Sequence, residues 1–130
     1  MQDKCRSLFV LMILVISTGC SMSVPIERVY GVYVASYSFG TEMITLNRDG
    51  TFVQSIAIKQ EQPVTIHGTW EFQSKESRIT MYGARVVDDG FGHLAKDWQT
   101  APIGLVSLSA EIHWFRIVIG SGLPNPYMKQ

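Results

Sequence analysis

Three histidines and several acidic residues are the side chains in this sequence that could hold a metal ion. The histidines are His67, His93 and His113, and acidic residues near His93 are Asp88, Asp89 and Asp97. No two histidines share a ligand spacing such as i, i+2 or i, i+4. His67 also falls on the polar face of its predicted strand, so we expect solvated histidines and no metal site.

Acid–base or nucleophilic catalysis requires several functional side chains close together. The spacing of the candidate acids and serines in this sequence does not indicate such a group. The candidates Glu42, Glu71 and Glu111 occur singly, so we expect exposed strand residues. None of the serines stands in a strand–turn–helix elbow. We therefore predict a protein that is not an enzyme and uses no cofactor. A hydrolase is the least favoured hypothesis, and it would require His93 and Asp97 to cluster with Glu111 or His113.

The stretch DDGFGHLAKDW, residues 88–98, concentrates acids, glycines and a histidine between two predicted strands. It lacks the ligand spacing of a Ca²⁺-binding loop. We interpret it as a hydrophilic lid, with a partner-binding loop as the alternative, because binding residues are often carried on loops.

Aromatic residues are the remaining candidates for a ligand site. Four of them lie close together in the sequence and could line a cavity or fill a core: Tyr30, Tyr33, Tyr37 and Phe39. The hypothetical ligand-binding set across the chain is Tyr33, Tyr37, Trp70 and Trp114.

The elements that must position these residues are strands. The sequence is rich in Val, Ile, Thr, Tyr, Phe and Trp, which is a β composition, and we find no convincing helical period. Eight strands are predicted, at about 30–38, 42–47, 51–59, 64–73, 78–82, 84–87, 103–109 and 111–119.

Turn chemistry and alternation refine this pattern. LNRDGTF has turn residues ending in Gly50, so the strands on either side should form a hairpin. In VTIHGTWEFQ, every second residue is apolar or glycine, which puts Trp70 in a core and His67 in solvent. Gly68, inside that strand, indicates a bend or a close approach of another segment.

Four motifs carry a resemblance to a known group: Gly31-Val32-Tyr33, LNRDGTF, GTWEF and RITMYG, followed by a closing PYMK. In this order they resemble small lipocalin-like bacterial envelope proteins, including the N-terminal barrel of copper-linked outer-membrane stress lipoproteins. The resemblance implies an all-β fold, a small antiparallel up-and-down barrel over residues 30–130. The copper-linked proteins carry an early Cys-x-x-Cys pair, which is absent here, so a copper or thiol role is not implied.

The first twenty residues read as a targeting segment. Lys4 and Arg6 precede nine consecutive apolar residues and then Ser17, Thr18 and Gly19. This is the pattern of a signal peptide and is too short for a spanning helix. ISTGC resembles the lipobox of bacterial lipoproteins, although Ser17 stands where Leu is usual. We predict a signal peptide over 1–19, lipidation at Cys20 and a tether over 20–29, with a plain secreted protein as the alternative.

The length, the charge and the cysteine content of the chain limit its domain number, its partners and its disulfides. From Cys20 to Gln130 there are 111 residues, enough for one domain. Of the 11 basic and 11 acidic residues, Lys4, Arg6 and Asp3 precede Cys20, which leaves nine basic and ten acidic. No basic stripe is available for nucleic acid, so we expect no nucleic-acid partner. Cys5 also precedes Cys20, so the mature chain has no internal disulfide.

Together these observations predict a binding module in the cell envelope, tethered to the membrane through Cys20. The partner would be a small apolar ligand or an envelope protein. An envelope inhibitor or immunity protein, with residues 88–98 as its contact loop, is the alternative. The residue after Cys20 is Ser21, and not the Asp that retains many such lipoproteins at the inner membrane. The resemblance therefore implies an outer-membrane lipoprotein that faces the periplasm, if the cell is Gram-negative.

Overall fold

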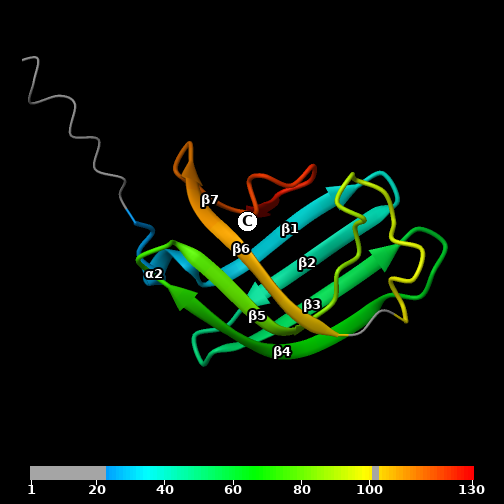
Figure 1. Cartoon of the computed structure of the whole chain (residues 1–130), viewed down its shortest axis with the longest axis horizontal. Helices are drawn as coiled ribbons and strands as arrows, with labels where there is room; N and C mark the ends of the chain where they lie inside the picture. Colours follow the sequence, from blue (N-terminus) through cyan, green and yellow to red (C-terminus); the bar gives the residue numbers. More distant parts are fainter. Residues whose placement is uncertain (1–22, 101–102) are drawn as a thin grey trace, which may run out of the picture.

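Eight antiparallel strands close into one barrel, in which each strand pairs with the next and β8 pairs with β1 (Figure 1). The structure is a computed structural model and describes residues 23–100 and 103–130. One helical turn, α2 (Ile26–Val29), precedes the barrel. The strands are β1 (Gly31–Tyr37), β2 (Gly40–Leu46), β3 (Thr51–Ile58), β4 (Val64–Gln73), β5 (Arg78–Ala84), β6 (Gly104–His113), β7 (Arg116–Ile119) and β8 (Tyr127–Lys129). The predicted all-β, up-and-down barrel is confirmed.

The β2–β3 hairpin forms where the turn chemistry predicts it. Gly50 has a φ of +82°, a conformation that costs glycine little, and its N–H donates to the Asn47 carbonyl over 3.3 Å. The Asp49 carboxylate accepts from the Thr51 N–H at 2.9 Å. These bonds fix the turn, and the hairpin register then pairs Leu46 with Phe52.

Strand β4 has the two faces that the alternation predicts. Ile66 and Trp70 are buried, whereas His67 and Glu71 are exposed. A Cβ added to Gly68 would clash with the Tyr82 carbonyl oxygen and the Phe52 ring. Gly68 therefore permits the close approach of neighbouring strands that the sequence indicated.

The later strands differ from the prediction. Strand β6 runs unbroken to His113, so there is no interruption between 109 and 111, because Ala110 continues the inward-facing alternation and is buried. The turn lies instead at Trp114 and Phe115. Residues 84–87 are not a separate strand: β5 extends to Ala84 through an irregularity at Gly83, whose φ is +90°. Strand β8 was not predicted, because it is only three residues long and follows two prolines.

The folded unit also begins earlier than predicted. Val24 and Val29, both in the predicted tether, are buried in the core, and the Tyr33 hydroxyl donates to the Val29 carbonyl at 2.6 Å. The Val24 N–H donates to Ser77 Oγ at 3.1 Å. The segment 24–29 is therefore packed against the barrel, and α2 covers one of its ends. The predicted signal peptide 1–19 and Cys20 lie outside the described residues.

The barrel has two different ends. One end, which we name the N-terminal end, carries α2 and the β2–β3, β4–β5 and β6–β7 turns. The opposite end, which we name the loop end, carries the β1–β2 and β3–β4 turns and the two longer connections, 120–126 and 85–103, the latter described for residues 85–100 and 103 (Figure 1). Trp98 of the first connection is buried with Ile56, Ile58 and Val87, so this connection is held against the barrel.

Candidate ligand cavity

A cavity of about 380 Å³ lies at the loop end, between the barrel wall and the connections 85–103 and 120–126. Most of its lining is apolar and comes from β2, β5, β6 and the two connections: Ile44, Met81, Ala84, Val86, Val87, Val106, Leu108, Leu123 and Pro124. A smaller set is polar: Tyr37, Glu42, Gln54, Arg85, Asp88, Asp89, Asn125 and Tyr127. An apolar wall with a few convergent polar groups is typical of small-molecule sites.

Glu42 is the least expected of the lining residues. We predicted an exposed carboxylate, but Glu42 is only 1% exposed. Alternate residues of β2 point inward, and Glu42 shares that face with Ile44 and Leu46. Gln54, on the neighbouring strand β3, is buried for the same reason. The prediction was wrong because a lone strand glutamate is normally solvated, whereas this one has buried partners.

Both oxygens of the Glu42 carboxyl have hydrogen-bond partners. The Tyr37 hydroxyl donates to Oε2 at 3.1 Å, and Gln54 Nε2 donates to Oε1 at 2.6 Å. The Gln54 amide also accepts from the Arg85 N–H at 2.9 Å and donates to the Arg85 carbonyl at 2.7 Å. One network therefore links β1, β2, β3 and the start of the 85–103 connection.

Burial controls the charge of this network. Desolvation raises the pKa of Glu42, against the opposing effect of hydrogen bonds from Gln54, Tyr127 and Tyr37, and the Asp88 charge raises it further. Burial, with the nearby Glu42 charge, also raises the pKa values of Tyr37 and Tyr127. Among the described residues, no basic side chain forms an ion pair with Glu42. Burial without a compensating cation is therefore the main cause of the raised pKa of Glu42.

Two further polar atoms lie buried among the residues that line the cavity. Arg85 Nε and Asp88 Oδ2 have no hydrogen-bond partner within the described structure. Buried polar groups are nearly always bonded. Because these two atoms have almost no accessible surface, a polar group in the cavity would reach them only after the Arg85 or Asp88 side chain changes its conformation.

The predicted ligand-binding aromatics are spread over the molecule. Tyr37 lines the cavity and stacks on Phe39 with ring centroids 4.7 Å apart. Tyr33 is fully buried, with its hydroxyl committed to Val29. Trp70 is buried towards the N-terminal end, where its Nε1 donates to the Asn47 carbonyl at 2.9 Å. Trp114 is exposed at the β6–β7 turn. Of the four, only Tyr37 lines the cavity.

The sequence reasoning missed Glu42, Gln54 and Tyr127. A signal existed for the first two, because strand alternation sets Glu42 on the face of Ile44 and Gln54 on the face of Ile56. Tyr127 lies in the closing PYMK motif, whose strand was not predicted. Its position against β1 and β7 follows from barrel closure.

The predicted catalytic and metal candidates do not gather. His93 lies at the loop end, where Nδ1 is 3.3 Å from Asp89 Oδ2. His113 lies at the N-terminal end, where Nε2 is 2.9 Å from Glu111 Oε2. His67 is exposed on β4. Within residues 23–100 and 103–130, no three His, Cys, Asp or Glu side chains are arranged to hold a metal ion.

Comparisons of the chain with models of protein families, with curated proteins and with solved structures found no match. The resemblance to lipocalin-like envelope lipoproteins therefore stays a prediction, and the barrel rests on the observed strand pairing. In the part of the chain that the structure describes, no helix is long and apolar enough to cross a membrane.

Glu42 gives a testable pH dependence. Its pKa is raised in the folded state, so between the unfolded value of about 4.3 and the folded value the native chain holds a proton that the unfolded chain has lost. This contribution to stability is full below the unfolded pKa and is lost as pH rises through the folded pKa. We expect Glu42→Gln to abolish the loss, measured as urea midpoints of parent and variant from pH 4 to pH 8.

The matched control is Glu71→Gln, which removes an exposed carboxylate from β4. Its pH profile should run parallel to that of the parent. If the Glu42→Gln profile also ran parallel to the parent, the burial of Glu42 would have no consequence for its ionisation.

Proposed function

We propose that this protein is a membrane-tethered envelope lipoprotein whose barrel binds a small, mostly apolar ligand that carries one polar head group. The observation that carries the proposal is the cavity of about 380 Å³ with apolar walls and the buried Glu42 network. Its volume is at the lower end of the range of about 300–1,000 Å³ for ligand pockets.

The polar groups indicate the chemistry of the head group. Glu42, Asp88 and Asp89 line the cavity against one basic residue, Arg85, so an anionic head is disfavoured. A neutral Glu42 can exchange hydrogen bonds with a hydroxyl, and an ionised one can pair with an amine. The ligand is therefore an apolar molecule with a hydroxyl or amine at one end.

The mouth of the cavity suits an apolar ligand. Val86 and Leu123 line the cavity and remain partly exposed to solvent. Solvent-exposed apolar side chains at the rim of a pocket are typical of ligand-binding grooves. Entry past these residues would desolvate the apolar part of the ligand before its head reaches Glu42.

The tether is supported by the sequence. The lipobox-like ISTGC precedes a chain that is packed on the barrel from Val24 onward. The N-terminal end and the cavity mouth lie at opposite ends of the barrel. An anchor at Cys20 would therefore leave the mouth free to meet ligands in the envelope space.

The proposal is tested with the purified mature protein. In mass spectrometry, we expect the mass of the native protein to exceed the mass of the denatured protein. The difference is the mass of a bound ligand that is lost on unfolding. Refilling the emptied protein with the neutral probe N-phenyl-1-naphthylamine should raise probe emission. Val106→Trp, which fills the cavity from β6, should abolish that rise.

The matched control uses the neighbouring residue on the same strand. Leu105 is largely exposed and does not line the cavity, so Leu105→Trp should bind the probe as the parent does. Equal native and denatured masses, together with probe emission that Val106→Trp leaves unchanged, would refute a ligand site in this cavity.

A second candidate, an envelope inhibitor or immunity protein, is favoured by one observation. Phe91 is largely exposed at the tip of the 88–98 loop, which Asp89 stiffens by accepting from the Phe91 N–H at 2.8 Å and the His93 N–H at 3.1 Å. A rigid aromatic tip suits a protein contact. The cavity makes a small ligand the better supported function.

A further inference from the structure

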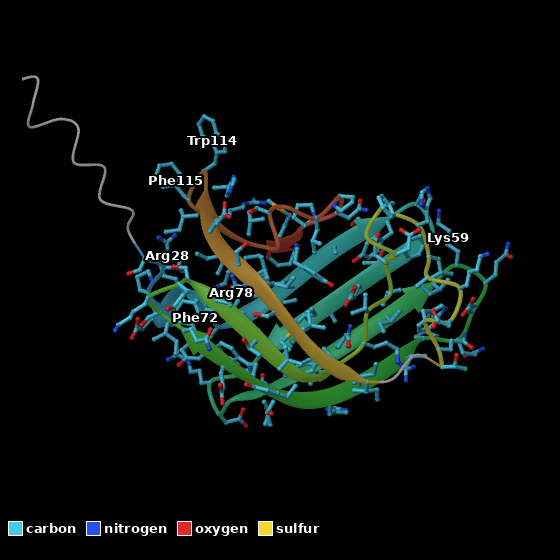
Figure 2. The ribbon with its side chains drawn as sticks, in the orientation of Figure 1. Arg28, Lys59, Phe72, Arg78, Trp114 and Phe115 are labelled. Carbon is cyan, nitrogen blue, oxygen red and sulfur yellow. The ribbon has the colours of Figure 1, made fainter. Side chains whose placement is uncertain are left out.

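The β6–β7 turn presents two aromatic side chains to solvent. Trp114 is 93% exposed and Phe115 is 90% exposed, and both project from the tip of the hairpin (Figure 2). Their φ angles are +49° and +70°, so this two-residue turn needs the left-handed conformation twice, for which Asn-Gly is the favoured sequence. Folding alone gives no reason for aromatic residues at these two positions.

The other turns at the same end show ordinary turn chemistry. The β2–β3 turn is Asn-Arg-Asp-Gly at 47–50, and the β4–β5 turn is Ser-Lys-Glu-Ser at 74–77. Polar residues therefore satisfy two hairpins of this barrel end. The aromatic pair differs from these turns because it exposes apolar surface and places two consecutive non-glycine residues at positive φ, whereas the β4–β5 turn has one such residue, Ser77 at +47°.

The tip lies beside the point where the chain enters the barrel. Arg28 Nη2, from α2, donates to the Phe115 carbonyl at 3.0 Å, and the Val24 N–H is fixed to Ser77 in the adjacent turn. Cys20 is four residues before Val24, so their Cα atoms are at most about 14 Å apart. A bilayer that holds an acyl chain on Cys20 would therefore lie close to the tip.

Two arginines lie beside the tip, Arg28 and Arg116, and Glu111, which is bonded to His113, lies at the same end. Arg116 follows Phe115, and Lys129 Nζ donates to the Arg28 carbonyl. Burial and, to a smaller extent, the Arg28 charge lower the pKa of Lys129. Aromatic residues flanked by Lys and Arg suit the headgroup region of a membrane with anionic lipids.

We propose that Trp114 and Phe115 insert into the headgroup region of the bilayer that carries the acyl anchor, and so seat the barrel on its N-terminal end. The inference rests on the anchoring at Cys20 in the proposed function. It adds an orientation: the loop end and the cavity mouth then face away from the membrane. Trp is favoured at this depth because its ring is apolar and its N–H is polar.

The test uses tryptophan fluorescence of the purified mature protein with vesicles of phosphatidylcholine and phosphatidylglycerol. Of the three tryptophans, Trp70 and Trp98 are buried, so Trp114 is the accessible one. We expect its emission to shift to the blue on the vesicles and to be quenched when the lipids carry brominated acyl chains.

A matched variant moves the tryptophan to the other end of the barrel. Trp114→Phe with Phe91→Trp exchanges the residues of two exposed tips and leaves the composition unchanged. This variant should lose the quenching by brominated lipid. Equal quenching of parent and variant would overturn the proposed orientation.

Intact mass separates failure of this inference from failure of the anchor. Acylated protein whose Trp114 is not quenched would overturn the inference and leave the anchor standing. Unacylated protein would overturn the anchor. Its tryptophan emission with excess vesicles would still test the insertion of Trp114, because an absence of quenching by brominated lipid would refute that insertion. A blue shift that grows with protein concentration without vesicles would assign the tip to a second copy of the chain instead.

Discussion

Replacing Trp70 by alanine is expected to lower the free energy of unfolding by about 3–5 kcal/mol. Trp70 is 5% exposed, and its ring meets Tyr30 edge-on with centroids 5.7 Å apart. The variant would leave a cavity in the core and remove the donor to the Asn47 carbonyl. A small domain is stable by only about 5–15 kcal/mol, so this loss is a large part of the total.

Urea unfolding of parent and variant measures the effect, and the chain offers a control of the same residue type. Trp114→Ala removes an equally large side chain that packs on nothing and should change the free energy of unfolding by less than about 0.5 kcal/mol. If Trp70→Ala had the same urea midpoint as the parent, Trp70 would not be the core anchor that its burial indicates.

The first half of the barrel could be predicted from the sequence because local signals there agree. Asp49 and Gly50 mark a hairpin turn, and strict alternation in β4 separates Trp70 from His67. These signals depend on neighbouring residues only, and the structure confirms them. Strands β1 to β4 therefore lie within two residues of the predicted limits.

The second half was harder because its local signals disagree with the fold. Trp114 and Phe115 form a two-residue turn without the glycine or asparagine that would announce one. Ala110 was taken as a break, although it continues β6. Strand β8 is stabilised by pairing with β1, from the other end of the chain. Such long-range pairing leaves no local pattern.

The cavity could not be predicted for a related reason. Glutamate is rarely buried, so the presence of Glu42 on an inward face reads as an exception to the alternation. What makes the burial tolerable is contributed by Gln54 on the next strand and by Tyr127 near the end of the chain. Only the closed barrel brings these three groups together, and the space between them depends on how the two long connections fold.

The two barrel ends carry different kinds of exception to ordinary folding chemistry. At the loop end, the residues that line the cavity contain a buried carboxyl and two buried polar atoms that have no hydrogen-bond partner in the described part of the chain. At the N-terminal end, two exposed aromatics occupy a turn that disfavours them. Deviations from local consistency tend to collect at functional sites. Their separation supports a division between ligand binding at one end and attachment at the other.

Replacing Cys20 by serine is expected to abolish attachment by acyl chains completely. The substitution removes the thiol that would take the diacylglyceryl group, and with it the signal for the lipoprotein peptidase that the lipobox resemblance implies. Each buried methylene contributes about 0.8 kcal/mol to membrane binding, so two or more acyl chains anchor a protein stably. A protein without acyl chains loses this contribution entirely. The variant should either enter the soluble envelope fraction, cut after Gly19, or remain as an uncut precursor.

Intact-mass analysis distinguishes these outcomes from the parent, which should begin at Cys20 and carry the added mass of acyl chains. The barrel should be unaffected, because the core formed by the described residues begins at Val24, four residues after Cys20. The urea midpoint of the variant should therefore equal that of the parent, and its cavity should bind the same probe. A parent that is soluble, unmodified and begins at or after Cys20 would refute the lipoprotein proposal, and Ser17 in the lipobox-like sequence would be the reason.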